Sequence, residues 1–113
     1  MNNEAIATIS LKESHLTLIN VFSVEAPKQQ ELVDLLTLAT ESSVSKVAGF
    51  VSASLHKSFD GTKVIMYAQW RSMADYQNMR NNPDASPYLL QALEFATFEP
   101  GMYEVVQVFL PGK

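Results

Sequence analysis

The chain has 113 residues, of which 47% are hydrophobic, with no cysteine and a net charge of −4. This suits a single domain over residues 1–113, and the lack of cysteine excludes disulfides and thiolate metal sites, which is compatible with a reducing cytoplasm. The eight Lys and Arg residues are scattered and no apolar run approaches the roughly 20 residues of a membrane span, so we expect a soluble cytoplasmic protein that binds neither nucleic acid nor membranes.

The first half of the chain predicts a strand followed by a helix. Residues 1–13 alternate weakly between apolar and polar side chains and form either an N-terminal arm or an edge strand. Residues 15–25 are rich in β-branched and aromatic side chains and predict the first main strand. Pro27 suits the first turn of a helix. The apolar positions that follow recur at spacings of three and four: Leu32, Leu35, Leu36 and Ala39. This spacing predicts a helix over 29–42.

A β-hairpin is predicted in the middle of the chain. Two alternating runs, 49–58 and 63–70, flank a short connection that contains Asp60-Gly61. This pair supplies the left-handed backbone of a tight turn. The second run ends at Trp70, the only tryptophan.

Helical segments are expected after the hairpin. Ser72 is a candidate N-cap, with Asp75 three residues further on. The run Asn81-Asn82-Pro83 interrupts this helix, and a second helical segment is expected over 86–95.

The last predicted strand covers residues 102–109, after a turn at Pro100-Gly101. The resulting order, β-α-β-β-α-β, is the ferredoxin-like arrangement of the α+β class, with an antiparallel sheet. Two helices cover only one face of such a sheet, and an apolar face left open on a soluble protein normally meets a partner. We therefore expect a homodimer in which two sheets pack face to face as a dimeric α+β barrel.

Several kinds of site are absent from the sequence. No glycine-rich phosphate loop opens a helix, and no nucleophile-elbow pattern is present. The two histidines, His15 and His56, stand far apart, with no carboxylate at the spacing of a metal-binding helix. We therefore expect no bound metal and no cofactor.

Residues 16–109 resemble the antibiotic biosynthesis monooxygenase family of small dimeric ferredoxin-like proteins. The resemblance begins with SVEAP followed by QQELVDLL and continues through the hairpin. The residues at the family's spacing are Gly49-Phe50, His56, Asp60-Gly61-Thr62, Tyr67-Ala68-Gln69-Trp70 and Tyr76. What the resemblance implies is cofactor-independent oxygenation of a small aromatic compound, a phenol or hydroquinone, by molecular oxygen.

The resemblance also implies a set of site residues. Asn20 and Trp70 match an asparagine and the tryptophan that act in family members, and His56 matches a pocket histidine suited to proton transfer. These three are the candidate catalytic residues. The candidate substrate-binding residues are Phe22, Met66, Tyr67 and Tyr76. Met66 stands where the family carries a second asparagine, and a methionine cannot donate a hydrogen bond.

Each candidate also has a purely structural interpretation. Asn20 is equally explained as a satisfied structural amide, Trp70 as core, and His56 as a solvent-exposed strand residue. Arg80 is interpreted as a solvated helix residue. The alternative functions are a non-catalytic ligand-binding dimer, or an isomerase or cyclase of the same fold with His56 as base. Haem is not expected, because no histidine occurs between residues 72 and 98.

Overall fold

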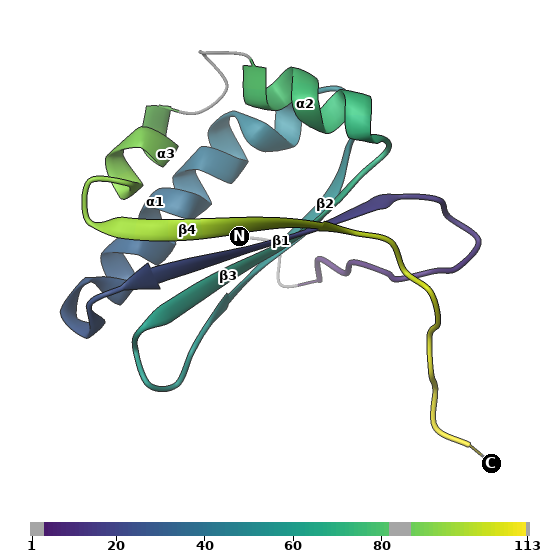
Figure 1. Ribbon diagram of the computed structural model, residues 1–113, viewed down its shortest axis with the longest axis horizontal. Coiled ribbons are helices and arrows are strands. Elements are labelled where there is room, and N and C mark those ends of the chain that lie inside the picture. The colour runs from purple at the N-terminus through teal and green to yellow at the C-terminus, as the bar shows by residue number, and fades with distance from the viewer. Residues whose placement is uncertain (1–3, 82–86, 113) are drawn as a thin grey trace.

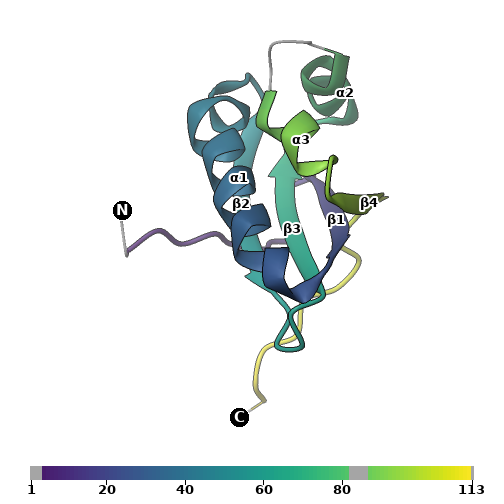
Figure 2. The ribbon, with the colours of Figure 1, turned by 90° about the vertical axis from the view of Figure 1, so that its left-hand side faces the viewer.

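The computed structural model describes residues 4–81 and 87–112, and their strands form one antiparallel sheet in the order β2-β3-β1-β4. The strands are β1 (Leu16–Val24), β2 (Phe50–Lys57), β3 (Lys63–Trp70) and β4 (Ala96–Tyr103). The helices are α1 (Gln29–Ser42), α2 (Met73–Asn81) and α3 (Pro87–Ala92), with short 3-10 turns at Ala26–Lys28 and Val44–Lys46. All three helices lie on one side of the sheet (Figures 1 and 2). The ferredoxin-like α+β fold is confirmed.

Helix α1 has the bounds that the sequence predicts. Its position is set by buried apolar side chains along one face and by hydrogen bonds from its first residue. Pro27 lies in the turn that precedes it, and the buried side chains are Leu32, Leu36 and Ala39. At its first residue, the Gln29 side-chain amide donates to the carbonyl oxygens of Ser58 (3.0 Å) and Lys63 (2.9 Å). The start of α1 is therefore bonded to both strands of the hairpin where they enter the turn.

The hairpin turn is organised by Asp60 and Gly61. Gly61 has φ +84°, a backbone conformation that other residues rarely adopt. One carboxylate oxygen of Asp60 accepts hydrogen bonds from the backbone N–H of Thr62 (2.9 Å), the Thr62 hydroxyl (2.7 Å) and the Ser58 hydroxyl (2.8 Å). These donors, the Thr62 N–H first, lower the pKa of Asp60 from 3.8 to about 2.

The depressed pKa of Asp60 predicts an acid-sensitive contribution to stability. The folded-state pKa lies below the ordinary value of 3.8. The ionised carboxylate therefore stabilises the fold fully above about pH 4, and this contribution disappears as the pH falls through about 2. We expect Asp60→Asn, which keeps a side-chain oxygen but removes the charge, to lower the urea midpoint at pH 7 and to match the unsubstituted protein near pH 2. A midpoint difference that is constant with pH would contradict this account.

The start of α2 is fixed against the start of β2. Ser72 Oγ accepts from the backbone N–H of Asp75 (3.1 Å), as an N-cap does, and Arg71 Nε lies 2.7 Å from the same Asp75 carboxylate. Gly49, with φ +92°, allows this approach, since a Cβ there would lie 2.4 Å from Asp75 Cβ. The expected N-cap is thus observed. The expected interruption at residues 82–83 lies outside the described residues.

The last strand differs from the prediction. We expected a turn at Pro100-Gly101 and a strand over 102–109, but β4 begins at Ala96 and runs straight through both residues. β4 is an edge strand that pairs only with β1. An edge strand tolerates proline, because an unpaired side is available for the missing N–H. The stacking of Phe98 on Phe22, with ring centroids 5.1 Å apart, fixes this earlier register.

The sheet face opposite the helices is partly covered by the N-terminal segment. The Gln69 side-chain amide donates to the carbonyl oxygen of Thr8 (2.9 Å), and residues 5–10 form no strand. At the other end, residues 104–112 run away from the sheet on the side opposite the helices (Figures 1 and 2). Within the described part of the chain, no helix has the length and apolar character required to cross a membrane.

Candidate active site

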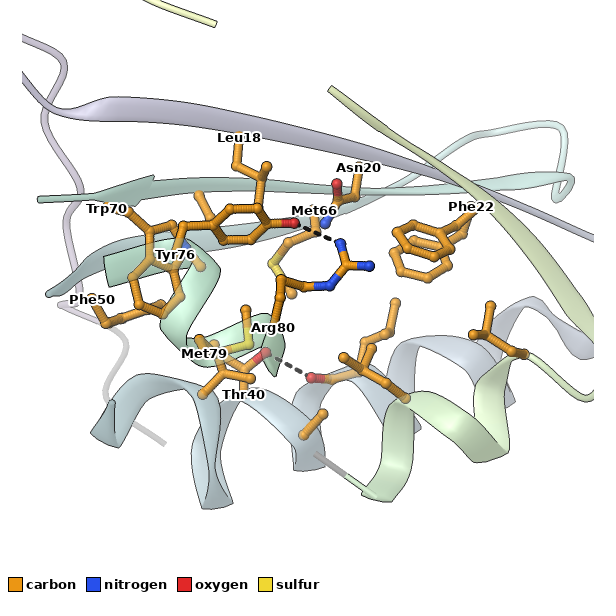
Figure 3. Close-up of a pocket in the computed structure, with 18 of the residues that line it drawn as sticks. Leu18, Asn20, Phe22, Thr40, Phe50, Met66, Trp70, Tyr76, Met79 and Arg80 are labelled. Atoms are coloured by element: carbon orange, nitrogen blue, oxygen red, sulfur yellow. Dashed lines mark hydrogen bonds between the residues drawn. The ribbon is translucent and has the colours of Figure 1, made fainter. Parts of the chain in front are cut away.

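A cavity of about 280 Å³ lies between the sheet and the helices. This is near the lower end of the range of about 300–1,000 Å³ typical of small-molecule sites. Its floor is made by alternate side chains of two neighbouring strands: Leu18, Asn20 and Phe22 from β1, and Met66, Ala68 and Trp70 from β3. Helices α1, α2 and α3 supply most of the remaining walls, with further residues from β2, β4 and the turn at Val44–Lys46. The cavity is therefore lined mainly by apolar and aromatic groups (Figure 3).

One end of the cavity is an aromatic wall. Trp70, only 1% exposed, meets the ring of Phe50 edge-on with centroids 5.5 Å apart. The Tyr76 ring lies 5.9 Å from Trp70 and tilted to it. Trp70 ends β3 and Tyr76 lies near the start of α2. The short connection between them, with its N-cap at Ser72, therefore sets their relative position. A flat aromatic ligand could stack in this corner.

Asn20 carries an unsatisfied polar atom in these apolar surroundings. Its side-chain oxygen Oδ1 is buried and has no hydrogen-bond partner among the described residues. The register explains why: Asn20 stands opposite Met66 on β3 and Pro100 on β4, neither of which has a side-chain N–H or O–H. A buried acceptor without a donor costs about 1–3 kcal/mol. Such a group is expected where a ligand supplies the missing donor.

Arg80 is an exposed helix residue, as the sequence predicts, but it is also a member of the site, which sequence reasoning missed. It lines the cavity, and its Nη1 donates to the Tyr76 hydroxyl (2.9 Å). Its guanidinium lies over the rings of Tyr76 and Phe98, with the carbon Cζ 5.9 Å from each centroid. The signal that could have found it is the spacing of four between Tyr76 and Arg80, which puts them on one face of a helix.

The structure brings five of the seven predicted site residues together. Those that line the cavity are Asn20, Phe22, Met66, Trp70 and Tyr76. His56 and Tyr67 are not among the lining residues, since strand alternation turns them to the opposite face of the sheet. There His56 Nε2 lies 2.9 Å from Ser54 Oγ, and the Tyr67 hydroxyl lies 3.4 Å from the Gln69 amide nitrogen.

One side chain supplies the charge at the cavity. Among the described residues that line it, Arg80 is the only charged one. The described part of the chain has no group of three or more His, Asp or Glu side chains placed to hold a metal ion. The arrangement therefore suits an apolar, planar ligand with a polar group that can donate to Asn20 and accept from the Arg80–Tyr76 side.

Comparison with known proteins identifies relatives over most of the chain. The family model described as antibiotic biosynthesis monooxygenase matches residues 15–88. Tetracenomycin-F1 monooxygenase of Streptomyces glaucescens is 41% identical over 104 residues, which cover 92% of this chain and 93% of that protein.

Solved structures with a similar fold are also found. A monooxygenase from the gene ActVA-Orf6 of Streptomyces coelicolor, in complex with the ligand nanaomycin D, superposes with a TM-score of 0.78 at 26% identity. The match covers 89% of this chain and 96% of that one. SnoaB, a cofactor-independent oxygenase from Streptomyces nogalater, has a TM-score of 0.75 at 19% identity, covering 88% and 99%. The second likeness shows a shared fold.

Proposed function

The chain belongs to the antibiotic biosynthesis monooxygenase family, and on that premise we propose that it is a cofactor-independent monooxygenase that oxidises a small phenolic or hydroquinone-like aromatic compound to a quinone. One atom of O₂ becomes the new carbonyl oxygen and the other leaves in water. The substrate thus loses two hydrogen atoms and gains one oxygen atom.

The observation that carries this proposal is the unpartnered oxygen of Asn20 in an aromatic-walled cavity. A phenol complements the cavity in two ways. Its flat apolar ring can stack on the aromatic wall, and its O–H group can donate a hydrogen bond to the unpaired Asn20 oxygen. A hydroxyl placed on Asn20 would satisfy the buried acceptor, whereas a hydrocarbon of the same shape would leave it unpaired. The cavity therefore favours hydroxylated aromatics over plain ones.

The chemistry assigned to the protein is binding and orientation, because the substrate is itself the electron donor. Loss of the phenolic proton gives an electron-rich anion, which passes one electron to O₂. The two radicals combine to form a C–O bond, and the resulting peroxide anion takes up a proton equivalent to the one that the phenol lost. The hydroperoxide then loses water as the proton on that carbon leaves. Trp70 and Tyr76 hold the ring, and Asn20 orients it by accepting a hydrogen bond from a protonated hydroxyl group of the substrate.

Oxygen consumption tests the proposal directly. Purified protein treated with a chelator is mixed with a panel of anthrones and naphthols, and dissolved oxygen and quinone absorbance are followed together. We expect uptake above the spontaneous rate, with one O₂ consumed per quinone formed. Trp70→Phe should reduce the rate about tenfold through a smaller stacking surface. Gln77→Ala, an exposed change next to Tyr76, is the matched control. Uptake at the spontaneous rate across the whole panel would contradict the proposal.

Met66 gives a second test of the same chemistry. It lies in the cavity directly across the ladder from Asn20, where a second amide would face the bound oxygen. An amide donor there would stabilise the negative charge that develops on oxygen, an effect worth about 10²-fold or more in other enzymes. We expect Met66→Asn to raise oxygen uptake, with Met66→Leu as the control that changes shape but adds no donor. Equal rates in the two variants would show that this position takes no part in charge stabilisation.

The same methionine favours one alternative, a dimer that binds the ligand without turning it over. A site with one amide in place of two can retain binding after losing catalysis. Titration of Trp70 fluorescence with each panel compound separates the two functions, since Trp70 is the only tryptophan and lines the cavity. Saturable quenching without oxygen uptake would identify a binding protein.

We also propose that the chain forms a homodimer through the open sheet face. Strand alternation puts the side chains of Ile19, Val21 and Ile65 on that face, opposite the cavity-lining positions. The C-terminal residues 104–112 carry further exposed apolar side chains: Val106, Phe109 and Leu110. A second copy would cover both surfaces. Light scattering should give twice the chain mass of 12.6 kDa, and a monomer at micromolar concentration would refute the dimer.

A further inference from the structure

The Arg80–Tyr76 pair has donors that its internal hydrogen bond leaves available. An arginine side chain has five N–H donors and no acceptor, so the Tyr76 oxygen must be the acceptor in the 2.9 Å bond. The Tyr76 hydroxyl proton is therefore free to point elsewhere. Described side chains engage one Arg80 nitrogen, through Tyr76. Both groups line the cavity, and Figure 3 shows the guanidinium beside the Tyr76 oxygen, between the aromatic wall and Phe22.

The position of Arg80 is held by packing as well as by this bond. Its guanidinium lies between the faces of Tyr76 and Phe98, each 5.9 Å from Cζ. Such contacts hold the guanidinium beside the cavity, although the side chain as a whole remains exposed to water. Tyr76 is itself 4% exposed, so the pair forms a fixed donor arrangement at the edge of an apolar space. Although the Arg80 side chain is exposed, its donors meet an apolar space, where a charged donor stabilises a nearby anion more strongly than in bulk water.

We propose that Arg80 and Tyr76 form an oxyanion-binding pair that holds the aromatic substrate as its phenolate, with an N–H of Arg80 and the O–H of Tyr76 both donating to the ionised oxygen. This rests on the proposed function and defines its substrate class more closely: aromatics whose hydroxyl ionises on binding. Asn20 contacts a second, protonated oxygen of the substrate, because the atom of its amide that lacks a partner is the acceptor Oδ1. The preferred substrate therefore carries two oxygen substituents, one ionised at Arg80 and one still protonated at Asn20.

The test is a titration of bound ligand that requires no turnover. The probe is 1-naphthol under argon, whose neutral and ionised forms differ in ultraviolet absorbance, with binding followed by Trp70 quenching. We expect the protein to lower the pKa of bound naphthol by about one unit, a tenfold shift toward the anion. Arg80→Gln, which keeps N–H donors but loses the charge, should abolish the shift. Arg80→Lys should retain part of it, and Tyr76→Phe should reduce it.

The matched control is Arg71→Gln. Arg71 precedes α2, has a side chain 66% exposed and does not line the cavity, so this variant has the same net charge as Arg80→Gln while the Ser72 cap still holds the start of α2. It should leave the naphthol pKa unchanged. Circular dichroism checks that each variant is folded. If Arg80→Gln does not fold, Arg80→Lys replaces it in the test.

The outcomes separate this inference from the proposed function. A pKa shift of bound naphthol that is as large in folded Arg80→Gln as in the original protein would overturn the oxyanion pair, even if the protein consumes oxygen. If Arg80→Gln does not fold, a full shift in Arg80→Lys would overturn it. A shift that is present in the original protein and absent in Arg80→Gln supports the pair, even if no panel compound is oxidised. Failure of naphthol to bind saturably would also count against it.

Discussion

Asn20→Leu is expected to lower oxygen uptake by about 100-fold or more while leaving the protein at least as stable as before. Removing a polar group that positions the substrate can misplace it by about 1 Å, which costs about 10²-fold in rate. Leucine has the same branching and the same number of side-chain heavy atoms as asparagine, so we expect the aromatic wall and the strand register to be retained. The measurement is oxygen consumption at saturating naphthol or anthrone, with ligand binding followed separately by Trp70 quenching.

The stability half of this prediction follows from the same atom. The buried Asn20 oxygen has no partner among the described residues, and an unpaired buried acceptor costs about 1–3 kcal/mol. Leucine removes the acceptor and adds apolar contact. We therefore expect the free energy of unfolding, measured by urea denaturation without ligand, to stay constant or rise by about that amount.

Thr17→Val is the control for the two predicted effects of Asn20→Leu, lower oxygen uptake and unchanged or higher stability. The Thr17 hydroxyl oxygen is the other buried side-chain atom without a partner in the described chain, but Thr17 does not line the cavity. Its replacement should raise stability with less than a twofold change in oxygen uptake. If Asn20→Leu retains full uptake, the substrate does not use the amide. If it loses stability sharply, Asn20 is a structural residue instead.

The largest effect on stability is expected from Leu32→Ala. Leu32 is 0% exposed and packs in the apolar cluster with Phe22, Leu36 and Val64, where α1 meets the sheet. It does not line the cavity, so the loss falls on packing alone. Truncating a fully buried leucine costs about 2–5 kcal/mol through lost contacts and the void left behind. Urea denaturation at a fixed protein concentration measures this loss.

Leu38→Ala provides the comparison on the same helix. Leu38 is 47% exposed, so its truncation should change the free energy of unfolding by less than about 1 kcal/mol. Two variants with similar losses would mean that the packing of α1 against the sheet is not what holds this half of the fold.

The local elements of this protein were determined by the sequence alone. The bounds of α1 and β3 agree with the predicted ranges, because Pro27 and the spacing of the leucines define the helix and Asp60-Gly61 defines the hairpin. The Ser72 cap was predicted for the same reason. Each of these signals acts within a few residues of chain, where backbone geometry and short-range hydrogen bonds decide the outcome.

The last strand was decided by the tertiary structure. Pro100-Gly101 is a turn signal in isolation, yet β4 continues through it. Pairing with β1 on one side and the stacking of Phe98 on Phe22 outweigh the local preference, and an edge position tolerates the proline. A preference worth a fraction of a kcal/mol per residue cannot compete with the hydrogen bonds to β1 and a stacked aromatic pair.

Only part of the site could be predicted from the sequence, because tertiary packing also decides which side chains face the cavity. Asn20, Trp70 and Tyr76 were found by resemblance, but nothing local shows that His56 faces away from the cavity or that Arg80 faces into it. A step of one residue along a strand reverses the face, and the direction of a helical side chain depends on what packs against that helix. Local chemistry specified which groups are present, and only the packing of α2 and β4 around the sheet decided which of them share a cavity.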